Sequence, residues 1–243
     1  MTLAEATARF LDYARQHDSP VTPQPQSSVR AQVLLLLRAC FPIDSVLSEI
    51  SPESLRDFLS RWYVERACAL TANDSNPSAD PDQVPQPSDL LDSVAAFFKW
   101  ADQQDGVDRF QKYSAILIEL SRSLPRALEI TSALTNALRR RGGAFGFPEF
   151  LTSFEEGGGS QYDIDVPGNV GAIDGYFRIV RVEGSSVEAE ELISEDRVWP
   201  IVFPSEVAAL LVEGHIINLE LVRKPEGWQI AGCGFAYPPG TEI

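Results

Sequence analysis

The stretch RRRGG at residues 139–143 divides this chain into two parts of different character. Upstream of it, apolar residues recur every three or four positions, as expected for helices that each bury one face. Arginines in a last helical turn complement the negative end of the helix dipole, and glycine is favoured just beyond a helix end. We therefore predict that a helical region ends at residue 141.

Downstream, the pattern changes first in composition and then in period. Residues 142–168 are rich in Gly, Phe and acidic residues, which is typical of a linker between domains. Beyond residue 168, apolar and polar residues alternate, as in Val187-Glu188-Ala189-Glu190, with the period of a strand. We predict strands at 173–182, 187–193, 198–203, 216–222 and 228–231, and a short helix at 204–211. This set suits a small all-β barrel of the SH3 or OB kind.

The region before residue 141 is predicted to be an all-α helical bundle. Ser51 suits the N-cap of its third helix, and Pro52 suits the first helical position. Pro125 is expected to begin a sixth helix, because proline is tolerated in a first turn but disrupts a helix interior. The predicted fold is therefore α+β with two domains: a helical domain over 1–141, a linker over 142–168 and an acidic β-barrel over 169–243.

The chain carries a net charge of −15, and this charge is unevenly distributed. Residues 1–141 carry a net charge of −3 and residues 142–243 a net charge of −12, whereas the helical pair at 108–141 carries +4. Bulk charge therefore opposes binding to phosphate backbones, so any nucleic-acid binding needs a local basic face.

Cysteine usage and hydropathy bear on location. The three cysteines are widely spaced, which argues against a disulfide framework and favours a reducing compartment. A membrane span requires about 18 consecutive apolar residues, and no apolar run in the sequence is close to that length. We therefore expect a cytoplasmic protein without a membrane partner.

Three segments carry a resemblance to a known family: FLDY at 10–13, LRDFL at 55–59 and LLDSVAAFFKW at 90–100. Over residues 1–106 the chain resembles the SAM-like core-binding domain of tyrosine recombinases and phage integrases. The catalytic half of that family requires a His-x-x-Arg element, which neither His17 nor His215 forms. The resemblance thus implies binding to DNA or to a DNA-associated protein, without recombination.

The basic residues near the end of the helical region are the candidate nucleic-acid site. Arginines beside aromatic residues bind phosphates and stack on bases. A helix C-cap followed by a solvated helical surface accounts for the same residues without a ligand. The candidates are Arg109, Lys112, Arg122, Arg126, Arg139, Arg140 and Arg141.

An acidic edge in the predicted barrel is the candidate partner site. It suits a basic protein partner, or it protects an edge strand from aggregation by charge. Its residues are Glu188, Glu190, Glu191, Glu195 and Asp196. Asp163, Asp165 and Asp174 suit a divalent cation, but they lack the spacing of a calcium loop, so we predict no metal site.

No sequence motif for nucleophilic, metal-dependent or nucleotide-dependent catalysis is present, and we predict neither enzymatic activity nor a cofactor. The four tryptophans are expected to be core anchors. The sequence therefore favours a non-enzymatic binding protein that associates with DNA through its helical domain. The alternatives are an interaction module whose acidic barrel recruits a basic partner, and an enzyme with an unrecognised site between the domains.

Overall fold

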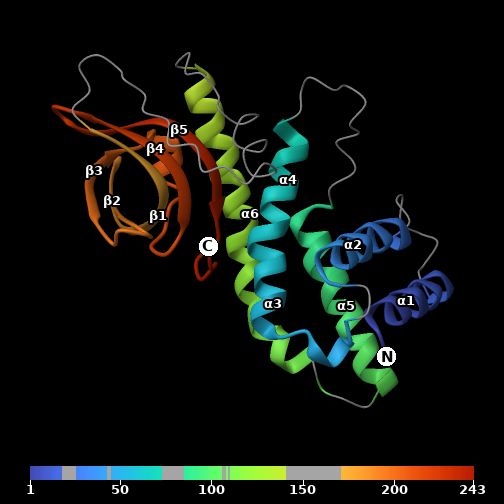
Figure 1. Ribbon diagram of the computed structural model, residues 1–243. Helices are drawn as coiled ribbons and strands as arrows, with labels where there is room; N and C mark the ends of the chain where they lie inside the picture. The colour runs from blue at the N-terminus through green and yellow to red at the C-terminus, as the bar shows by residue number, and fades with distance from the viewer. Residues whose placement is uncertain (18–25, 43–44, 73–84, 106–107, 109, 141–170) are drawn as a thin grey trace. The chain divides into compact units, whose positions relative to one another are not determined.

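The computed structural model describes residues 1–17, 26–42, 45–72, 85–105, 108, 110–140 and 171–243 (Figure 1). It confirms an α+β fold, with a helical N-terminal region and a five-stranded C-terminal sheet. The chain divides into two compact units, Met1–Pro125 and Arg126–Thr241. The predicted linker at 142–168 lies outside the described residues.

The helical N-terminal region contains six α-helices in the described residues, and the third begins where the sequence predicts. Ser51 is the N-cap of α3, where its hydroxyl accepts a hydrogen bond from the Ser54 backbone N–H at 3.0 Å. A π-helical segment, Phe58–Trp62, continues α3 into α4. The helices are α1 (Leu3–His17), α2 (Gln26–Cys40), α3 (Pro52–Asp57), α4 (Tyr63–Ala72), α5 (Pro87–Asp105) and α6 (Phe110–Arg140).

Aromatic side chains form much of the core of this unit. The Phe10 ring on α1 lies 5.5 Å from the rings of both Phe97 and Trp100 on α5, measured between centroids. The Tyr113 hydroxyl on α6 donates a buried hydrogen bond of 2.7 Å to the Ile50 carbonyl. Burial of these large rings removes much apolar area from water, which is the main stabilising term of such a bundle.

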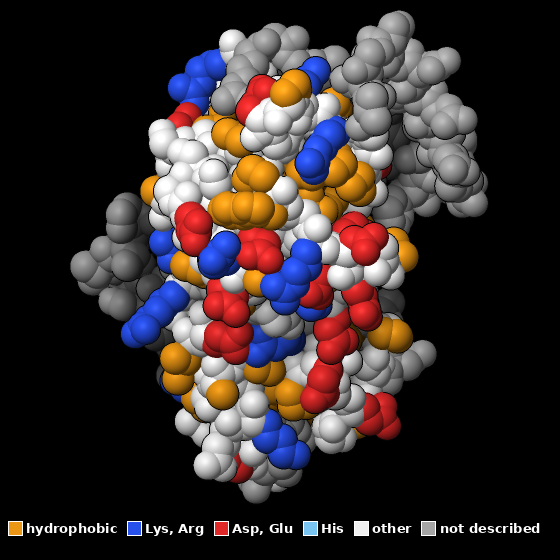
Figure 2. Space-filling model, turned by 90° about the vertical axis from the view of Figure 1, so that its left-hand side faces the viewer, with side chains coloured by type: hydrophobic (Ala, Val, Ile, Leu, Met, Phe, Trp, Pro, Cys, Tyr) orange, Lys and Arg blue, Asp and Glu red, His pale blue; other side chains and the backbone are white. Residues whose placement is uncertain are grey.

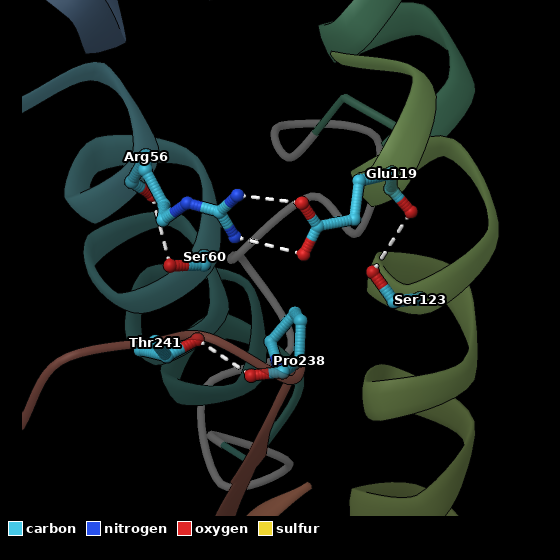
Figure 3. Close-up of polar contacts among 6 residues, drawn as sticks. All are labelled: Arg56, Ser60, Glu119, Ser123, Pro238 and Thr241. Atoms are coloured by element: carbon cyan, nitrogen blue, oxygen red, sulfur yellow. Dashed lines mark hydrogen bonds and ion pairs between the residues drawn. The ribbon is translucent and has the colours of Figure 1, made fainter. Parts of the chain in front are cut away.

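A bidentate ion pair joins α3 to the first half of α6 (Figure 3). Arg56 donates from Nη1 and Nη2 to the two carboxylate oxygens of Glu119, at 2.9 and 2.6 Å. These hydrogen bonds lower the pKa of Glu119, although partial burial opposes the shift. The planar guanidinium matches the carboxylate in geometry, so the pair makes two parallel hydrogen bonds between the two helices.

The prediction that Pro125 begins a separate helix is wrong, because α6 runs without a break from Phe110 to Arg140 with Pro125 in its interior. Pro125 is exposed on this helix. Buried residues continue at helical spacing on both sides of it, including Leu120, Leu124, Ala127 and Ile130. This continuous apolar stripe favours one helix despite the backbone hydrogen bond that proline cannot make.

The sheet contains β1 (Ala172–Glu183), β2 (Ser186–Glu191), β3 (Arg197–Val202), β4 (Ile216–Lys224) and β5 (Gly227–Tyr237). Their order is β1-β2-β3-β5-β4, and β4 also pairs with β1. Only the pairing of β3 with β5 is parallel. The short helix α8 (Ser205–Ala208) follows β3, as the sequence predicts.

Strand β5 is longer than predicted. Its continuation contains Gly232 and Gly234, which obscure the alternating pattern on which the prediction relied. Close approach constrains Gly234 most, because an added Cβ there would lie 2.5 Å from the Asn218 amide oxygen and 3.1 Å from the Asn218 Cβ. At Gly232 an added Cβ would lie 2.7 Å from a carboxylate oxygen of Glu220, at the end of a flexible side chain. The strand therefore persists through residues that ordinarily weaken one.

The second half of α6 packs against β5 within the second unit (Figure 1). Strand β5 pairs with β3 at Trp228 and Gln229, and its later residues have no partner on that side among the strands that the structure describes. There the buried Thr131 hydroxyl accepts a hydrogen bond of 2.9 Å from the Ala236 backbone N–H. Ile130, Leu134 and Leu138 join the sheet core. Helix α6 thus covers an exposed strand edge and satisfies one of its donors.

Replacing Thr131 with Val should destabilise the second unit by about 1–3 kcal/mol, because the Ala236 N–H would be left buried without an acceptor. Chemical denaturation measures the change in the free energy of unfolding. Ser132→Ala, on the exposed side of the same helical turn, is the matched control and should change stability little. Equal stabilities of the two variants would show that this hydrogen bond is not needed.

Candidate functional site

The five described basic candidates are spread along one long helix. Arg109 and Arg141 lie outside the described residues, and the other five are on α6. Lys112 and Arg140 are separated by about 42 Å along the helix axis, at 1.5 Å per residue. Arg140 is in addition paired with Glu206 of α8, at 3.2 Å. Lys112 and Arg122 belong to the first unit, whereas Arg126, Arg139 and Arg140 belong to the second.

Two residues of the predicted acidic edge are engaged by arginines. Glu188 on β2 forms ion pairs with Arg181 of β1 at 3.4 Å and Arg197 of β3 at 3.1 Å. Glu190 pairs with Arg178 of β1 at 3.3 Å. The negative charges of β2 are thus balanced by arginines of the neighbouring strands β1 and β3, because cross-strand partners lie close together. Glu195 and Asp196 are exposed in the turn between β2 and β3.

Glu191, the remaining acidic candidate, has a local structural role. Its side chain is only 7% exposed, and its carboxylate accepts backbone hydrogen bonds from Ile193 at 3.0 Å and Ser194 at 2.5 Å. Burial acts to raise its pKa, but these hydrogen bonds outweigh burial and the pKa is lowered. The side chain therefore holds the β2–β3 turn in place and is unavailable to a partner.

The outer face of β1, β2 and β3 brings together a set of residues that the sequence assigned to different roles. Cross-strand register aligns Arg178, Glu190 and Arg197 in one row, and Arg181 with Glu188 in the next. Beside them Trp199 is 38% exposed, and the Arg181 guanidinium lies 5.3 Å from its ring centroid. We name this set the arginine–tryptophan face: Arg178, Arg181, Glu188, Glu190, Arg197 and Trp199.

Acidic and basic side chains interleave on the side of the molecule where Figure 1 draws β2 and β3 (Figure 2). The arginines of the face remain partly accessible, with exposed side-chain fractions of 55% for Arg181 and 61% for Arg197. An exposed aromatic ring flanked by accessible guanidinium groups has the elements of a recognition surface for planar anionic ligands.

The prediction that all four tryptophans are core anchors is wrong for Trp199. Trp100 is buried, and Trp62 and Trp228 are half-buried. The register between β2 and β3 shifts between Val187 and Ala189, so Val198 and Ile201 point inward and Trp199 lies outside. Simple alternation does not reveal such an irregularity, because the shift depends on the pairing of two strands.

The remaining titratable candidates have structural explanations. His215 is fully buried, and its Nδ1 accepts a hydrogen bond of 3.0 Å from the Val212 backbone N–H. Burial, with a contribution from Arg126, lowers its pKa to about 4, so the ring is neutral near pH 7. Asp174 lies opposite Glu220 in the sheet, and desolvation raises the pKa of both carboxyls.

No arrangement in the described part of the chain groups three or more His, Cys, Asp or Glu side chains around a metal position. Asp163 and Asp165 lie outside that part. Among the helices of the described ranges, none combines the length and hydropathy needed to cross a membrane. The chain matches no protein-family model, no curated protein and no solved structure.

The lowered pKa of Glu191 predicts a pH-dependent contribution to stability. A carboxylate with a folded-state pKa below its unfolded value of about 4.3 stabilises the fold above that pH. The stabilisation is lost as the pH falls through the folded-state pKa. Glu191→Gln should therefore destabilise the protein at pH 7 by about 1–3 kcal/mol, and the difference from wild type should shrink towards pH 3.

Denaturant unfolding at several pH values tests this contribution. The exposed Glu213 provides the control, since Glu213→Gln should leave stability nearly unchanged. A deficit for Glu191→Gln that stays constant between pH 7 and pH 3 would contradict the role assigned to the charged carboxylate.

Proposed function

We propose that this chain is a non-enzymatic binding protein and that it binds single-stranded nucleic acid through the arginine–tryptophan face. The observation that carries the proposal is the Trp199 ring on β3, which is 38% exposed, with the Arg181 guanidinium of β1 over the ring at 5.3 Å and Arg197 two residues earlier on the same strand. Aromatic rings stack on bases of any sequence, and guanidinium groups bind the phosphates that link successive nucleotides.

The form of the sheet supports this choice of ligand. Five strands whose order returns from β4 to β1, with a short helix between the third and fourth, suit a small barrel of the OB kind. OB-folds bind oligonucleotides and oligosaccharides on the face that includes their second and third strands. The arginine–tryptophan face includes those strands here, and it differs from the helical site to which the recombinase resemblance points.

The charge of the whole chain limits the expected affinity. A net charge of −15 repels a polyanion at long range, so the attraction must come from the face itself. Binding should therefore be weak and should decrease steeply as salt is added. Acidic residues of the second unit that lie outside the face, among them Glu206 and Glu213, contribute to this repulsion.

The alternatives have less support in the described residues. Recruitment of a basic protein by the acidic edge is weakened because Glu188 and Glu190 are already paired and Glu191 is buried. An enzymatic role has little support: the Ser205 hydroxyl contacts the Glu206 carboxylate at 3.4 Å, but these two residues are adjacent and exposed at the start of α8. Cys40 and Cys233 are free thiols, and burial raises their pKa values to about 11 and about 12. Free thiols suit a reducing compartment such as the cytoplasm.

Fluorescence anisotropy with a labelled oligothymidylate of about 12 nucleotides tests the proposal at low salt, since OB-folds cover sites of about this length. The wild-type chain should bind it. Trp199→Ala should weaken binding about fivefold or more, the cost of losing one base stack. Arg197→Ala should weaken binding and also reduce its salt dependence.

Lys112→Ala and Arg122→Ala on α6 are the matched controls, because both residues are exposed and lie in the first unit. They should leave the affinity unchanged. Weaker binding in these α6 variants, with full binding in the Trp199 and Arg197 variants, would assign the site to the helical region instead. Absence of binding at low salt would exclude the proposed function.

A further inference from the structure

We infer that the Glu188 carboxylate lies at the position on the arginine–tryptophan face where a ligand phosphate would bind. The phosphate therefore binds by displacing this carboxylate. This inference rests on the proposed function and names both the chemistry of the ligand and a residue that limits its binding. The ligand unit is a phosphate group next to a planar base.

The geometry around Glu188 is that of an anion held between two cations. Its Oε2 lies 3.4 Å from Arg181 Nε, and its Oε1 lies 3.1 Å from Arg197 Nη1. The two arginines come from β1 and β3, on either side of the β2 strand that carries Glu188. Two guanidinium groups that converge on one oxyanion form the arrangement that recognises phosphate as well as carboxylate.

Glu188 differs in this respect from the other acidic residue of the face. Glu190 has a described ion pair with one arginine, Arg178. The Glu188 side chain is 17% exposed, although both of its partners are more than half exposed. The Glu188 side chain is therefore largely shielded from water, whereas both arginine side chains remain largely accessible.

Trp199 determines where a stacked base would lie relative to the position held by the Glu188 carboxylate. The Arg181 guanidinium contacts both the Glu188 carboxylate and the Trp199 ring. A base stacked on Trp199 would thus place its adjoining phosphate near Arg181, where it competes with Glu188. A neutral ligand brings no charge to replace the carboxylate, so the face should select ligands that are anionic as well as planar.

Competition of this kind is energetically accessible. Both arginines are more than half exposed, so water solvates their guanidinium groups well when the Glu188 charge is removed, and the ion pairs contribute little to folding stability. Removing the Glu188 charge should therefore leave the fold intact while it frees Arg197 and the Nε of Arg181, whose Nη1 stays paired with Glu183 at 3.1 Å. It should also remove a repulsion from the ligand phosphate. The same change should steepen the salt dependence of binding, because more cationic side chains then contact phosphate.

The test compares Glu188→Gln with wild type, using the full chain and the labelled oligothymidylate described above. We expect Glu188→Gln to bind about three- to tenfold more tightly at low salt, as removal of one like charge a few ångströms from a phosphate would produce. Glu190→Gln should tighten binding less, and Glu213→Gln, outside the face, should have no effect. Glu188→Ala serves as a second variant, and thermal unfolding verifies that each protein is folded.

The outcomes separate this inference from the proposed function. Wild-type binding that is unchanged or weakened in both Glu188 variants would overturn the inference and leave the proposed function standing. Absence of binding by wild type and by both variants would overturn both. Binding by the Glu188 variants alone would support the inference and would contradict nucleic-acid binding by the unaltered chain.

Discussion

The antiparallel register of β1, β2 and β3 is the constraint on which the candidate site depends. It places arginines of β1 and β3 beside the glutamates of β2. The shift in the register of β2 and β3 between Val187 and Ala189 leaves Trp199 outside the core. Charge balance within this face explains how a strongly acidic region presents accessible guanidinium groups. A change of register by one residue would turn these side chains inward and remove the face.

The sheet keeps this form partly because α6 covers the edge that β3 leaves unpaired on β5. Thr131 satisfies a backbone donor there, while Ile130, Leu134 and Leu138 extend the apolar core of the sheet. The same helix contributes Tyr113 and Glu119 to the helical unit. A helix with one continuous apolar stripe thus supplies core residues to both units, which explains why proline in its middle does not end it.

Hydrophobic periodicity predicted the α+β fold, and residue preferences at helix ends predicted the Ser51 N-cap, because both depend on local sequence. The short helix after the third strand was predicted for the same reason. Periodicity did not predict the length of β5 or the continuity of α6, because Gly232, Gly234 and Pro125 are local breakers whose effect is overridden by packing. The site was predicted only in its acidic half. Glu188 and Glu190 were found from their alternation, but their arginine partners and the exposure of Trp199 follow from strand pairing, which one strand alone does not reveal.

The central claim is that the outer face of β1–β3, and not the basic residues of α6, is the ligand-binding surface. The most direct measurement is a nuclear magnetic resonance titration of the isotopically labelled chain with oligothymidylate. The account predicts that shift changes concentrate on the amides of residues 178–181, 188–190 and 197–199 and on the Trp199 indole. Changes confined to residues 112–140 of α6, with the strand resonances unmoved, would contradict it.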